Sequence, residues 1–593
     1  MKLLPSIFYS IEVGRARSLV RLIPLAIVVL GIIALYNMRI YKGLDDMPSM
    51  DNAQLARQIE RHQGFTTYFI RPYALTQVAT YKAAHGQAEL FPDSLYPSTS
   101  PRSIPDTYNA PAFPLLLAGF FKVIGVDFDE SVGSMQAHHA FAGDRWIPFL
   151  NATFILLTAG LMFFLGWRLF DERVAWMGSV AFIVSDFVWN YSLVALPINL
   201  LMFLTTALFL GAAELYRMAE ENFNENEENA PIGWAWLIVP VLAVLLGVIC
   251  LNSLLLLVLV LPFTVFLMLM RRRSWFFPFI VLGIVGLMVA PWFYHWYRIC
   301  GNPLGSNLTL GLLGQGDYTG NQIYCATIIP SYEGLFSHFG AKQYAGFLYY
   351  FQHAWSLLGS HPLVLLFAAS ILHQFRRRRV QAFRWLVVIC ALCIVFATNL
   401  GNARPDAVGD WNLVAILLPA MILIGAAFFF TLLDNMTTQL PLLNVTLVVA
   451  TLALTFAPML LIFTTSGGGS YYNYPPYLPP ILSYVTHLSP ADQWVTSDVP
   501  WATAWYGDRP SLWVPDSMTD FTNINDNVCE SSMILFTPVT MDKPATNLVT
   551  GEQKDWLPFV LRLTIPETFP LQHFVKFPGV SDYNLITNLG AHK

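Results

Sequence analysis

Two adjacent runs near the start of the chain decide its fold. Residues 22–40 read LIPLAIVVLGIIALYNMRI, and residues 41–72 read YKGLDDMPSMDNAQLARQIERHQGFTTYFIRP. The first run is long and apolar enough to cross a bilayer as a helix. The second run places acidic and basic side chains directly beyond that helix, namely Asp45, Asp46, Asp51, Lys42, Arg57, Arg61 and Arg71. In a chain with few charges to place, such a cluster at a membrane boundary indicates a functional surface.

The composition of the whole chain is that of a membrane protein. Of 593 residues, 55% are hydrophobic and 12% are charged, and the mean hydropathy is +0.51. Soluble domains carry about 25% charged residues. Repeated apolar runs of about 20 residues predict a polytopic α-helical membrane protein. The net charge of -5 is small and says nothing about nucleic acid, but no basic domain stands apart, so we expect no nucleic-acid partner.

The distribution of basic residues predicts the topology. Basic side chains precede the first run and no small-residue cleavage site follows it, so we expect a retained helix with a cytoplasmic N-terminus. If the apolar segment 110–125 lies in the membrane interface instead of crossing, the later arginine clusters all fall on the cytoplasmic side. This topology has about 11 spans, which are the first run and ten later apolar segments. They are expected near 146–167, 174–190, 193–215, 234–251, 254–270, 275–296, 346–372, 381–398, 412–433 and 444–464.

Three regions follow from this topology. Residues 1–21 form a cytoplasmic N-terminus, and residues 22–464 form the transmembrane domain, whose first outer loop is 41–145. Residues 465–593 form an extracytoplasmic domain that begins with a proline- and tyrosine-rich linker. Its short β-like runs predict a small α/β or α+β fold, and they are Gln493–Ser497, Ser511–Val514, Ser532–Phe536 and Phe559–Leu563.

The charged stretch after the first span contains a predicted short helix, Ser49–His62. Ser49 suits the N-cap, which would place Asp51 in the first turn, where the helix dipole favours an anion. Apolar residues on one side of this helix predict that it lies on the outer leaflet. Asp51 could serve only to complement the helix N-terminus, and Asp45 with Asp46 could be a solvated turn.

Cysteine and histidine give no metal site. The six cysteines lack metal-ligand spacing, and the Cys390–Cys393 pair falls inside an apolar run, where packing is the simpler interpretation. A disulfide between Cys300 and Cys325, in one outer loop, stays open. We therefore expect no metal and no cofactor, although a divalent metal is not excluded.

Five segments, in this order, resemble the motifs of the GT-C membrane glycosyltransferases, the class of the aminoarabinose transferases and the family 39 protein O-mannosyltransferases. Residues 51–57 (DNAQLAR) resemble D-E-x-x-Y-A-x-I-A-R, and residues 109–116 (NAPAFPLL) resemble P-P-L-Y-x-x-L. Residues 166–173 (GWRLFDER) resemble G-R-R-L-F-G-R-R, and residues 290–303 resemble A-P-W-x-x-R-N-Y-x-x-x-G-N-P. Residues 411–419 resemble R-Y-x-x-P-x-x-P less closely.

The resemblance implies a GT-C fold at a bacterial-type inner membrane and a defined reaction. A sugar on a polyprenyl phosphate would be attacked at its anomeric carbon by an acceptor hydroxyl at the outer face, with inversion. A carboxylate must take the proton as attack proceeds, and Asp51 matches the motif position for this general base. Asp45 and Asp46 are candidate second carboxylates. Asn52 stands where the family has Glu, which leaves the sugar and the acceptor open.

Further roles are expected for residues around Asp51. A cation should bind the donor phosphate, for which arginine is suited by its forked donors; the candidates are Arg71 first, then Lys42, Arg57 and Arg404. Each could instead pair with a carboxylate or a lipid headgroup. The sugar or acceptor pocket would draw on Asn52, Tyr68, Tyr73, Tyr108 and Asn109, although the tyrosines could equally form an interfacial belt.

Two other classes of protein compete with this interpretation. A transporter usually carries ionisable residues within its spans, whereas here the charge is concentrated in the outer loops. A non-catalytic scaffold with the same fold would be consistent with Asn52. The expected partners are membrane lipid and a polyprenyl-phosphate sugar; the sequence says nothing of protein partners.

Overall fold

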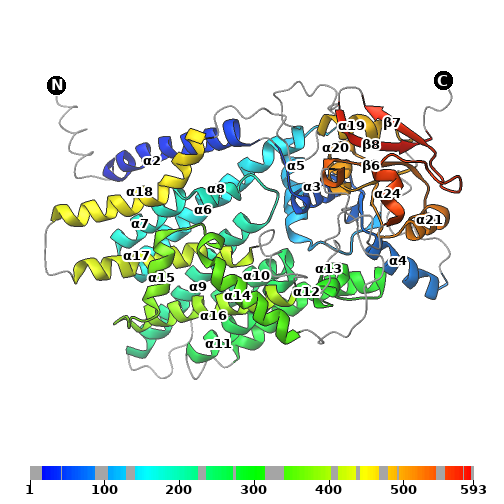
Figure 1. The fold of residues 1–593 in the computed structure, drawn as a ribbon. Helices are drawn as coiled ribbons and strands as arrows, with labels where there is room; N and C mark the ends of the chain where they lie inside the picture. Colours follow the sequence, from blue (N-terminus) through cyan, green and yellow to red (C-terminus); the bar gives the residue numbers. More distant parts are fainter. Residues whose placement is uncertain are drawn as a thin grey trace.

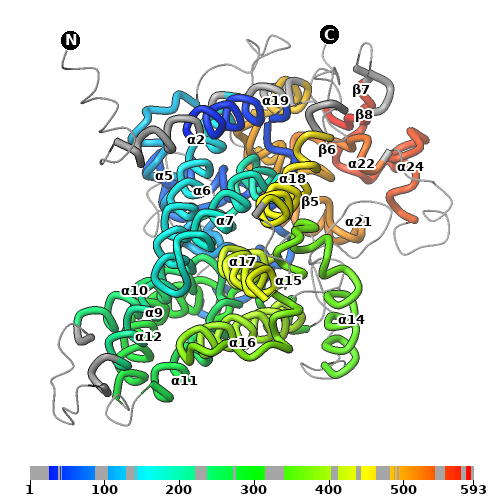
Figure 2. The backbone as a smooth tube through the Cα atoms, turned by 90° about the vertical axis from the view of Figure 1, so that its left-hand side faces the viewer, coloured from blue at the N-terminus to red at the C-terminus, as the bar shows by residue number. Residues whose placement is uncertain are grey.

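The protein has a long helical part with an α/β unit at one end (Figure 1). The structure, a computed structural model, describes residues 16–41, 43–86, 104–128, 141–224, 235–270, 276–313, 339–401, 412–435, 441–465, 479–490, 493–541, 554–577 and 580–588. The long helices run side by side across Figure 1, and the strands gather at its right-hand end. Figure 2 looks at the opposite end, where α17 (Leu418–Asp434) and α18 (Pro441–Thr465) are seen nearly end-on.

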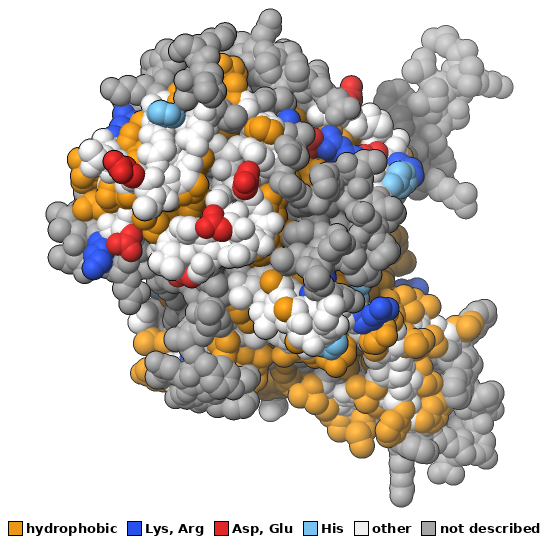
Figure 3. Space-filling view, turned by 90° about the vertical axis from the view of Figure 1, so that its right-hand side faces the viewer, with side chains coloured by type: hydrophobic (Ala, Val, Ile, Leu, Met, Phe, Trp, Pro, Cys, Tyr) orange, Lys and Arg blue, Asp and Glu red, His pale blue; other side chains and the backbone are white. Residues whose placement is uncertain are grey.

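Six helices in the described part of the chain are long and apolar enough to cross a membrane. Besides α17 (with the 3₁₀ turn that precedes it) and α18, they are α6 (Ala142–Leu169), α9 (Ile198–Asn224), α12 (Phe277–Cys300) and α16 (Arg378–Gly401). On the face seen in Figure 3, hydrophobic side chains dominate the lower right, whereas most of the acidic side chains lie on the upper left. Apolar residues on the outside of the helices, such as Leu287 at 77% exposure, suit contact with lipid.

The other five predicted spans correspond to shorter or broken helices. A span needs about 20 apolar residues in a helix; α10 is a continuous but shorter apolar helix, and the other four segments combine helices with 3₁₀ or π turns or with short loops. The five segments are α2 (Ala16–Leu35) with η1 (Tyr36–Ile40), α7 (Glu172–Ile183) with α8 (Asp186–Asn190), α10 (Ala235–Asn252), η3 (Leu254–Leu259) with α11 (Val260–Met270), and α14 (Phe339–Leu357) with α15 (Pro362–Ser370). The count of 11 spans therefore stays a prediction.

Several of the arginines on which the predicted topology depends meet at one end of the bundle. Arg168, at the end of α6, lies 3.1 Å from Glu214 on α9. Arg173, at the start of α7, lies 3.2 Å from Asp434 at the end of α17. This end is the left of Figure 1, and the α/β unit occupies the right. The predicted topology requires these arginines to lie at the same end of the bundle, and they do. Which side of a membrane that end faces is a separate question.

The short apolar segment near residue 110 forms a helix that is too short to span. It is α5 (Ala112–Ile124), which ends at Gly125 in a left-handed conformation (φ 70). Thirteen residues extend about 20 Å, against about 30 Å of hydrocarbon. Its buried face, which includes Phe113, Leu117 and Phe121, packs against α3 (Met47–Glu60). This geometry agrees with a helix that does not cross.

The C-terminal unit is built on a six-stranded mixed sheet with the order β2-β5-β4-β6-β8-β7. β2, β5, β4 and β6 are parallel, and β8 and β7 are antiparallel to their neighbours. The first strand comes from the first predicted outer loop and not from the C-terminal region. The strands are β2 (Phe69–Ile70), β4 (Trp494–Ser497), β5 (Ser511–Trp513), β6 (Ser531–Phe536), β7 (His573–Phe577) and β8 (Val580–Thr587).

Helices connect and cover this sheet. They are α19 (Pro479–Leu488), α20 (Pro500–Gly507), α21 (Met518–Asn527), α22 (Pro538–Met541) and, after the 3₁₀ turn η7 (Lys554–Trp556), α24 (Leu557–Val560). Three predicted strands coincide with β4, β5 and β6. The fourth, Phe559–Leu563, is wrong: its first residues belong to the short helix α24, which has Pro558 in its first turn, and Phe559 with Val560 is buried in the core. The boundaries at 21 and 465 stay predictions.

Candidate functional site

The helix that carries Asp51 begins earlier than the sequence predicts. Asp46, not Ser49, is the N-cap of α3, and its carboxylate accepts a hydrogen bond of 3.0 Å from the Ser49 backbone N–H. Pro48 stands in the first turn, where a missing N–H costs nothing. Asp51 therefore lies beyond the first turn, and the idea that it serves only the helix N-terminus loses its basis.

α3 is a buried helix, so its predicted place on the surface of the outer leaflet is wrong. Every residue from Ser49 to Gln58 is buried, between α5, α20 and the segment that precedes α9. The Ser49 hydroxyl accepts from the Ala195 backbone N–H at 2.9 Å, and the Asn52 amide donates to the Ala195 carbonyl at 3.2 Å. Asn52, predicted for the sugar or acceptor pocket, thus anchors α3 to the helical part.

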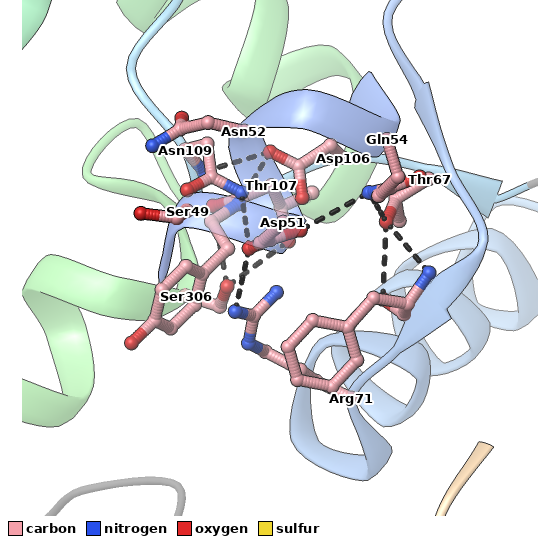
Figure 4. Close-up of polar contacts among 12 residues, drawn as sticks. Ser49, Asp51, Asn52, Gln54, Thr67, Arg71, Asp106, Thr107, Asn109 and Ser306 are labelled. Atoms are coloured by element: carbon pink, nitrogen blue, oxygen red, sulfur yellow. Dashed lines mark hydrogen bonds and ion pairs between the residues drawn. The ribbon is translucent and has the colours of Figure 1, made fainter. Parts of the chain in front are cut away.

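Three donors converge on the Asp51 carboxylate (Figure 4). Its Oδ2 accepts from Arg71 Nη2 at 2.7 Å and from Asn109 Nδ2 at 2.7 Å, and its Oδ1 accepts from Gln54 Nε2 at 3.1 Å. Each carboxylate oxygen has about two acceptor positions. Oδ2 is therefore fully used, and Oδ1 keeps one position for a further donor. With Asp51 only 1% exposed, a substrate must displace neighbouring side chains to reach it.

Arg71 is held rigidly beside Asp51. Its guanidinium carbon lies 3.9 Å from the centre of the Phe69 ring and 3.6 Å from the centre of the Tyr108 ring. Both members of the ion pair are buried, so removing either one would leave an uncompensated charge in the interior. The structure brings together four residues that the sequence named as candidates, Asp51, Arg71, Tyr108 and Asn109. Gln54 lies inside the first motif but was not named.

A second carboxylate, Asp106, adjoins the pair and was not predicted. Its Oδ2 accepts backbone N–H bonds from Asn109 at 2.7 Å and from Tyr108 at 3.3 Å. Burial, together with the nearby Asp51 charge, raises the pKa of Asp106 to about 7, against the opposing effect of Arg71. The only sequence signal was a carboxylate three residues before Asn109.

The chain near Asp106 is fixed from the helical part. The Ser306 N–H donates to the Thr107 carbonyl at 2.9 Å, and the two side-chain hydroxyls lie 3.2 Å apart. Ser306 is in α13 (Gly305–Leu312), which follows the predicted G-N-P segment. Next to this contact, Thr107, Asp106 and Arg71 help to line a cavity of about 10 Å³, room for about one water.

The remaining predicted site residues lie elsewhere or outside the described residues. Arg57 is buried against α20, which favours a structural role over phosphate binding. Tyr68 is buried and its backbone N–H donates to Gln54 at 3.0 Å, while the Tyr73 hydroxyl accepts from Gln77 at 2.6 Å. Lys42 and Arg404 lie outside the described residues.

The two earlier carboxylates lie at the start of α3, away from the Asp51 carboxylate. Burial raises the pKa of Asp45, and it raises that of Asp46 to about 6 against the hydrogen bonds from Ser49. Asp46 also helps to line a cavity of about 330 Å³, whose other lining residues are Pro48, Phe187, Asn190, Tyr191, Val194 and Leu196. That volume is at the lower end for small-molecule sites.

Within the described ranges, no three His, Cys, Asp or Glu side chains come together as a metal site. Among the described residues Cys300 is a free thiol, which donates to the Trp296 carbonyl at 3.3 Å, and the predicted alternative of a disulfide to Cys325 stays open. Cys325 lies outside the described residues.

No family model and no curated protein matches this chain. Solved structures do share its fold, and they are GT-C membrane glycosyltransferases. One is ArnT from Cupriavidus metallidurans bound to undecaprenyl phosphate, at 12% identity and a TM-score of 0.52, covering 96% of this chain and 98% of that one. Another is the archaeal oligosaccharyltransferase AglB from Archaeoglobus fulgidus in complex with an inhibitory peptide and a dolichol-phosphate, at 11% identity and a TM-score of 0.52, covering 90% and 72%. At such identities the likeness shows the fold, and it confirms the predicted GT-C fold.

Proposed function

We propose that the protein is a glycosyltransferase that moves a sugar from a polyprenyl phosphate to an acceptor hydroxyl at the outer face of a membrane. The observation that carries the proposal is the buried Asp51 carboxylate, fixed by Arg71, Asn109 and Gln54, with one acceptor position left on Oδ1. The two solved structures above are described with undecaprenyl phosphate and with a dolichol-phosphate, which supports a polyprenyl-phosphate donor here.

The proposed step balances with one proton acceptor. The acceptor oxygen forms a bond to the anomeric carbon, and the bond from that carbon to the phosphate oxygen breaks. The electron pair leaves with the polyprenyl phosphate, and the hydroxyl proton passes to Asp51 Oδ1 as the new bond forms. Attack from the side opposite to the phosphate inverts the anomeric centre.

Of the cations predicted to bind the donor phosphate, Arg71 is the one whose side chain contacts Asp51 among the described residues, at 2.7 Å. Its rigid seat between two rings suits the task of keeping the carboxylate aimed, and the donor phosphate is itself a good leaving group. We therefore propose that the main role of Arg71 is to orient the Asp51 carboxylate. Binding of the donor phosphate by Arg71, Lys42 or Arg404 stays a proposal from the sequence.

The test is label transfer in membranes from a panel of polyprenyl-phosphate sugars. Asp51→Asn keeps the size and most hydrogen bonds of the side chain but cannot take the proton. We expect the transfer rate to fall about 10²- to 10⁴-fold, the range for loss of a general base. Asp555→Asn, an exposed carboxylate of the C-terminal unit, is the matched control.

Undiminished transfer by Asp51→Asn, at normal expression and topology, would reject Asp51 as the base and direct attention to Asp106 and Asp46. A wild-type chain that transfers no sugar from the panel would instead favour the scaffold interpretation. A transporter would be recognised by substrate accumulation in proteoliposomes without any covalent transfer.

A further inference from the structure

The C-terminal unit reaches the Asp51–Arg71 pair by two routes that meet at Asp508. This residue lies between α20 and β5, directly after the last residue of the helix and shortly before the first residue of the strand. It ends α20 in a left-handed conformation, with φ 50. Its side chain is 31% exposed and faces α3.

The first route joins the end of α20 to α3. Arg57, whose side chain is 1% exposed, donates to the Ala504 carbonyl at 2.6 Å and to the Trp505 carbonyl at 2.8 Å. Carbonyls in the last turn of a helix lack partners within it and carry partial negative charge. Asp508 adds its own charge, 3.1 Å from Arg57, and accepts two hydrogen bonds from Arg61 at 2.9 and 2.7 Å. Two arginines one turn apart, Arg57 in α3 and Arg61 at its C-cap, therefore bind the end of α20.

The second route joins β5 to the strand before Arg71. Phe69 and Ile70 of β2 pair in parallel with Ser511 and Leu512, and the Ser511 N–H donates to the Tyr68 carbonyl at 2.7 Å. Arg71 is the next residue after β2. The direction of its side chain is therefore set by a strand that belongs to the sheet of the C-terminal unit.

α20 is itself fixed against the helical part, so it can serve as a frame. Asp144, near the start of α6, accepts from the Trp505 indole N–H at 2.7 Å and from the Tyr506 hydroxyl at 2.9 Å. The Tyr506 hydroxyl oxygen also lies 3.0 Å from the Leu44 carbonyl oxygen, just before α3, so its single proton can go to either of the two acceptors. The end of α20 thus contacts α6 and the segment that precedes α3.

We propose that Asp508 is a positioning residue for the Asp51–Arg71 pair, and that the C-terminal unit thereby forms part of the active site. Asp51 and Arg71 stand on separate elements, and their contact requires both elements to be held. Asp508 touches no reacting atom; it acts on Asp51 through the two arginines of α3 and on Arg71 through β5. The kinetic part of this inference rests on the proposed transferase function.

The kinetic test uses the full chain with Asp508→Asn, which keeps the shape of the side chain and removes its charge. A misplacement of about 1 Å can cost about 10²-fold in rate, so we expect kcat to fall about 10- to 100-fold. KM for the lipid-linked donor should stay within about twofold. Asp508→Glu, which keeps the charge, should restore part of the rate, and Asp555→Asn should behave as wild type.

A purely structural role would give a different result. If Asp508→Asn lowers activity only in proportion to the loss of folded protein, or leaves kcat unchanged, the proposal is wrong. Hydrogen–deuterium exchange gives a readout that does not depend on any activity. Asp508→Asn should raise exchange in peptides from residues 47–72 and leave α17 unchanged. If the wild type transfers no sugar, the proposed function fails, whereas unchanged exchange over 47–72 would overturn the positioning role.

Discussion

Asp106 is a titratable residue beside Asp51 that links pH to the stability of the site. Its folded pKa, raised to about 7 by burial and the Asp51 charge, lies above the ordinary carboxyl value of 3.8 that we assign to the unfolded chain. Between about pH 4 and pH 7 the folded protein holds a proton that the unfolded chain has lost, so stability falls as the pH rises through this window. Above about pH 7 the loss is complete. Asp106→Asn has no such proton, and it can still accept the two backbone hydrogen bonds.

We therefore expect the melting temperature of Asp106→Asn, relative to wild type, to rise from pH 4.5 to pH 7 and then to level off. The measurement is thermal unfolding of the full chain in detergent at a series of pH values. For Asp555→Asn the difference from wild type should stay flat, since that carboxylate is exposed. Parallel curves for Asp106→Asn and wild type would mean that Asp106 does not hold a proton in this range.

The sequence identified single site residues where a motif named them. Asp51 came from its place after the first span, and Asn109 and Arg71 from their nearness to the second motif and the predicted helix. Asp106 was not predicted, because its spacing from Asp51 in the sequence does not indicate that the two residues lie close together in the fold. The partners of Arg57 could not be predicted for a related reason: they are backbone carbonyls of α20, far along the chain, and the sequence does not show which carbonyls a side chain will reach.

At the scale of elements, the α12–α13 corner holds the loop of Asp106 in place. Gly305 has φ +71, and a Cβ there would lie 2.5 Å from the Thr107 carbonyl oxygen and 3.1 Å from the Trp296 ring. Gly305→Ala must adopt a left-handed conformation, which costs about 1–2 kcal/mol, and must also push the Thr107 backbone away. We expect a lower melting temperature and slower sugar transfer, because Asp106 directly precedes Thr107 and Asn109 follows it two residues later.

Gly283→Ala is the matched control on α12, since a Cβ at Gly283 meets nothing within 4 Å. Alanine favours a helix over glycine by up to about 1 kcal/mol, so this variant should melt no lower than wild type. A Gly305→Ala chain as stable and as active as the control would show that the corner can shift without effect on the site.

The elements that the sequence predicts well are those with a strong period or a long apolar run, such as α6, α16 and the strands β4, β5 and β6. β2 shows where such reasoning ends. It has two residues, Phe69 and Ile70, and it is a strand only because these residues pair with β5. A pairing between the first loop and the C-terminal region has no local signal, so the sequence treated the two as separate regions when they share one sheet.

For the whole molecule, the positive-inside rule applied to the sequence placed on one side several arginines that the fold does bring to one end of the bundle. Arg168 and Arg173 bind carboxylates of α9 and α17 at the end opposite to the C-terminal unit (Figure 1). The predicted span count stays a prediction, because hydropathy does not reveal where an apolar stretch breaks into 3₁₀ turns or short helices. The side of the membrane on which each end lies follows from the positive-inside rule alone.

The orientation can be tested with one cysteine at each end. Glu172, at the start of α7, and Asp555, on the C-terminal unit, are both exposed. By the positive-inside rule, a membrane-impermeant maleimide should label Asp555→Cys in intact cells whose outer layers are permeable to it. It should label Glu172→Cys only after the inner membrane is opened, with the unchanged chain giving the background from native thiols. The reverse pattern would place the Asp51–Arg71 pair on the cytoplasmic side, where the proposed outer-face transfer could not occur.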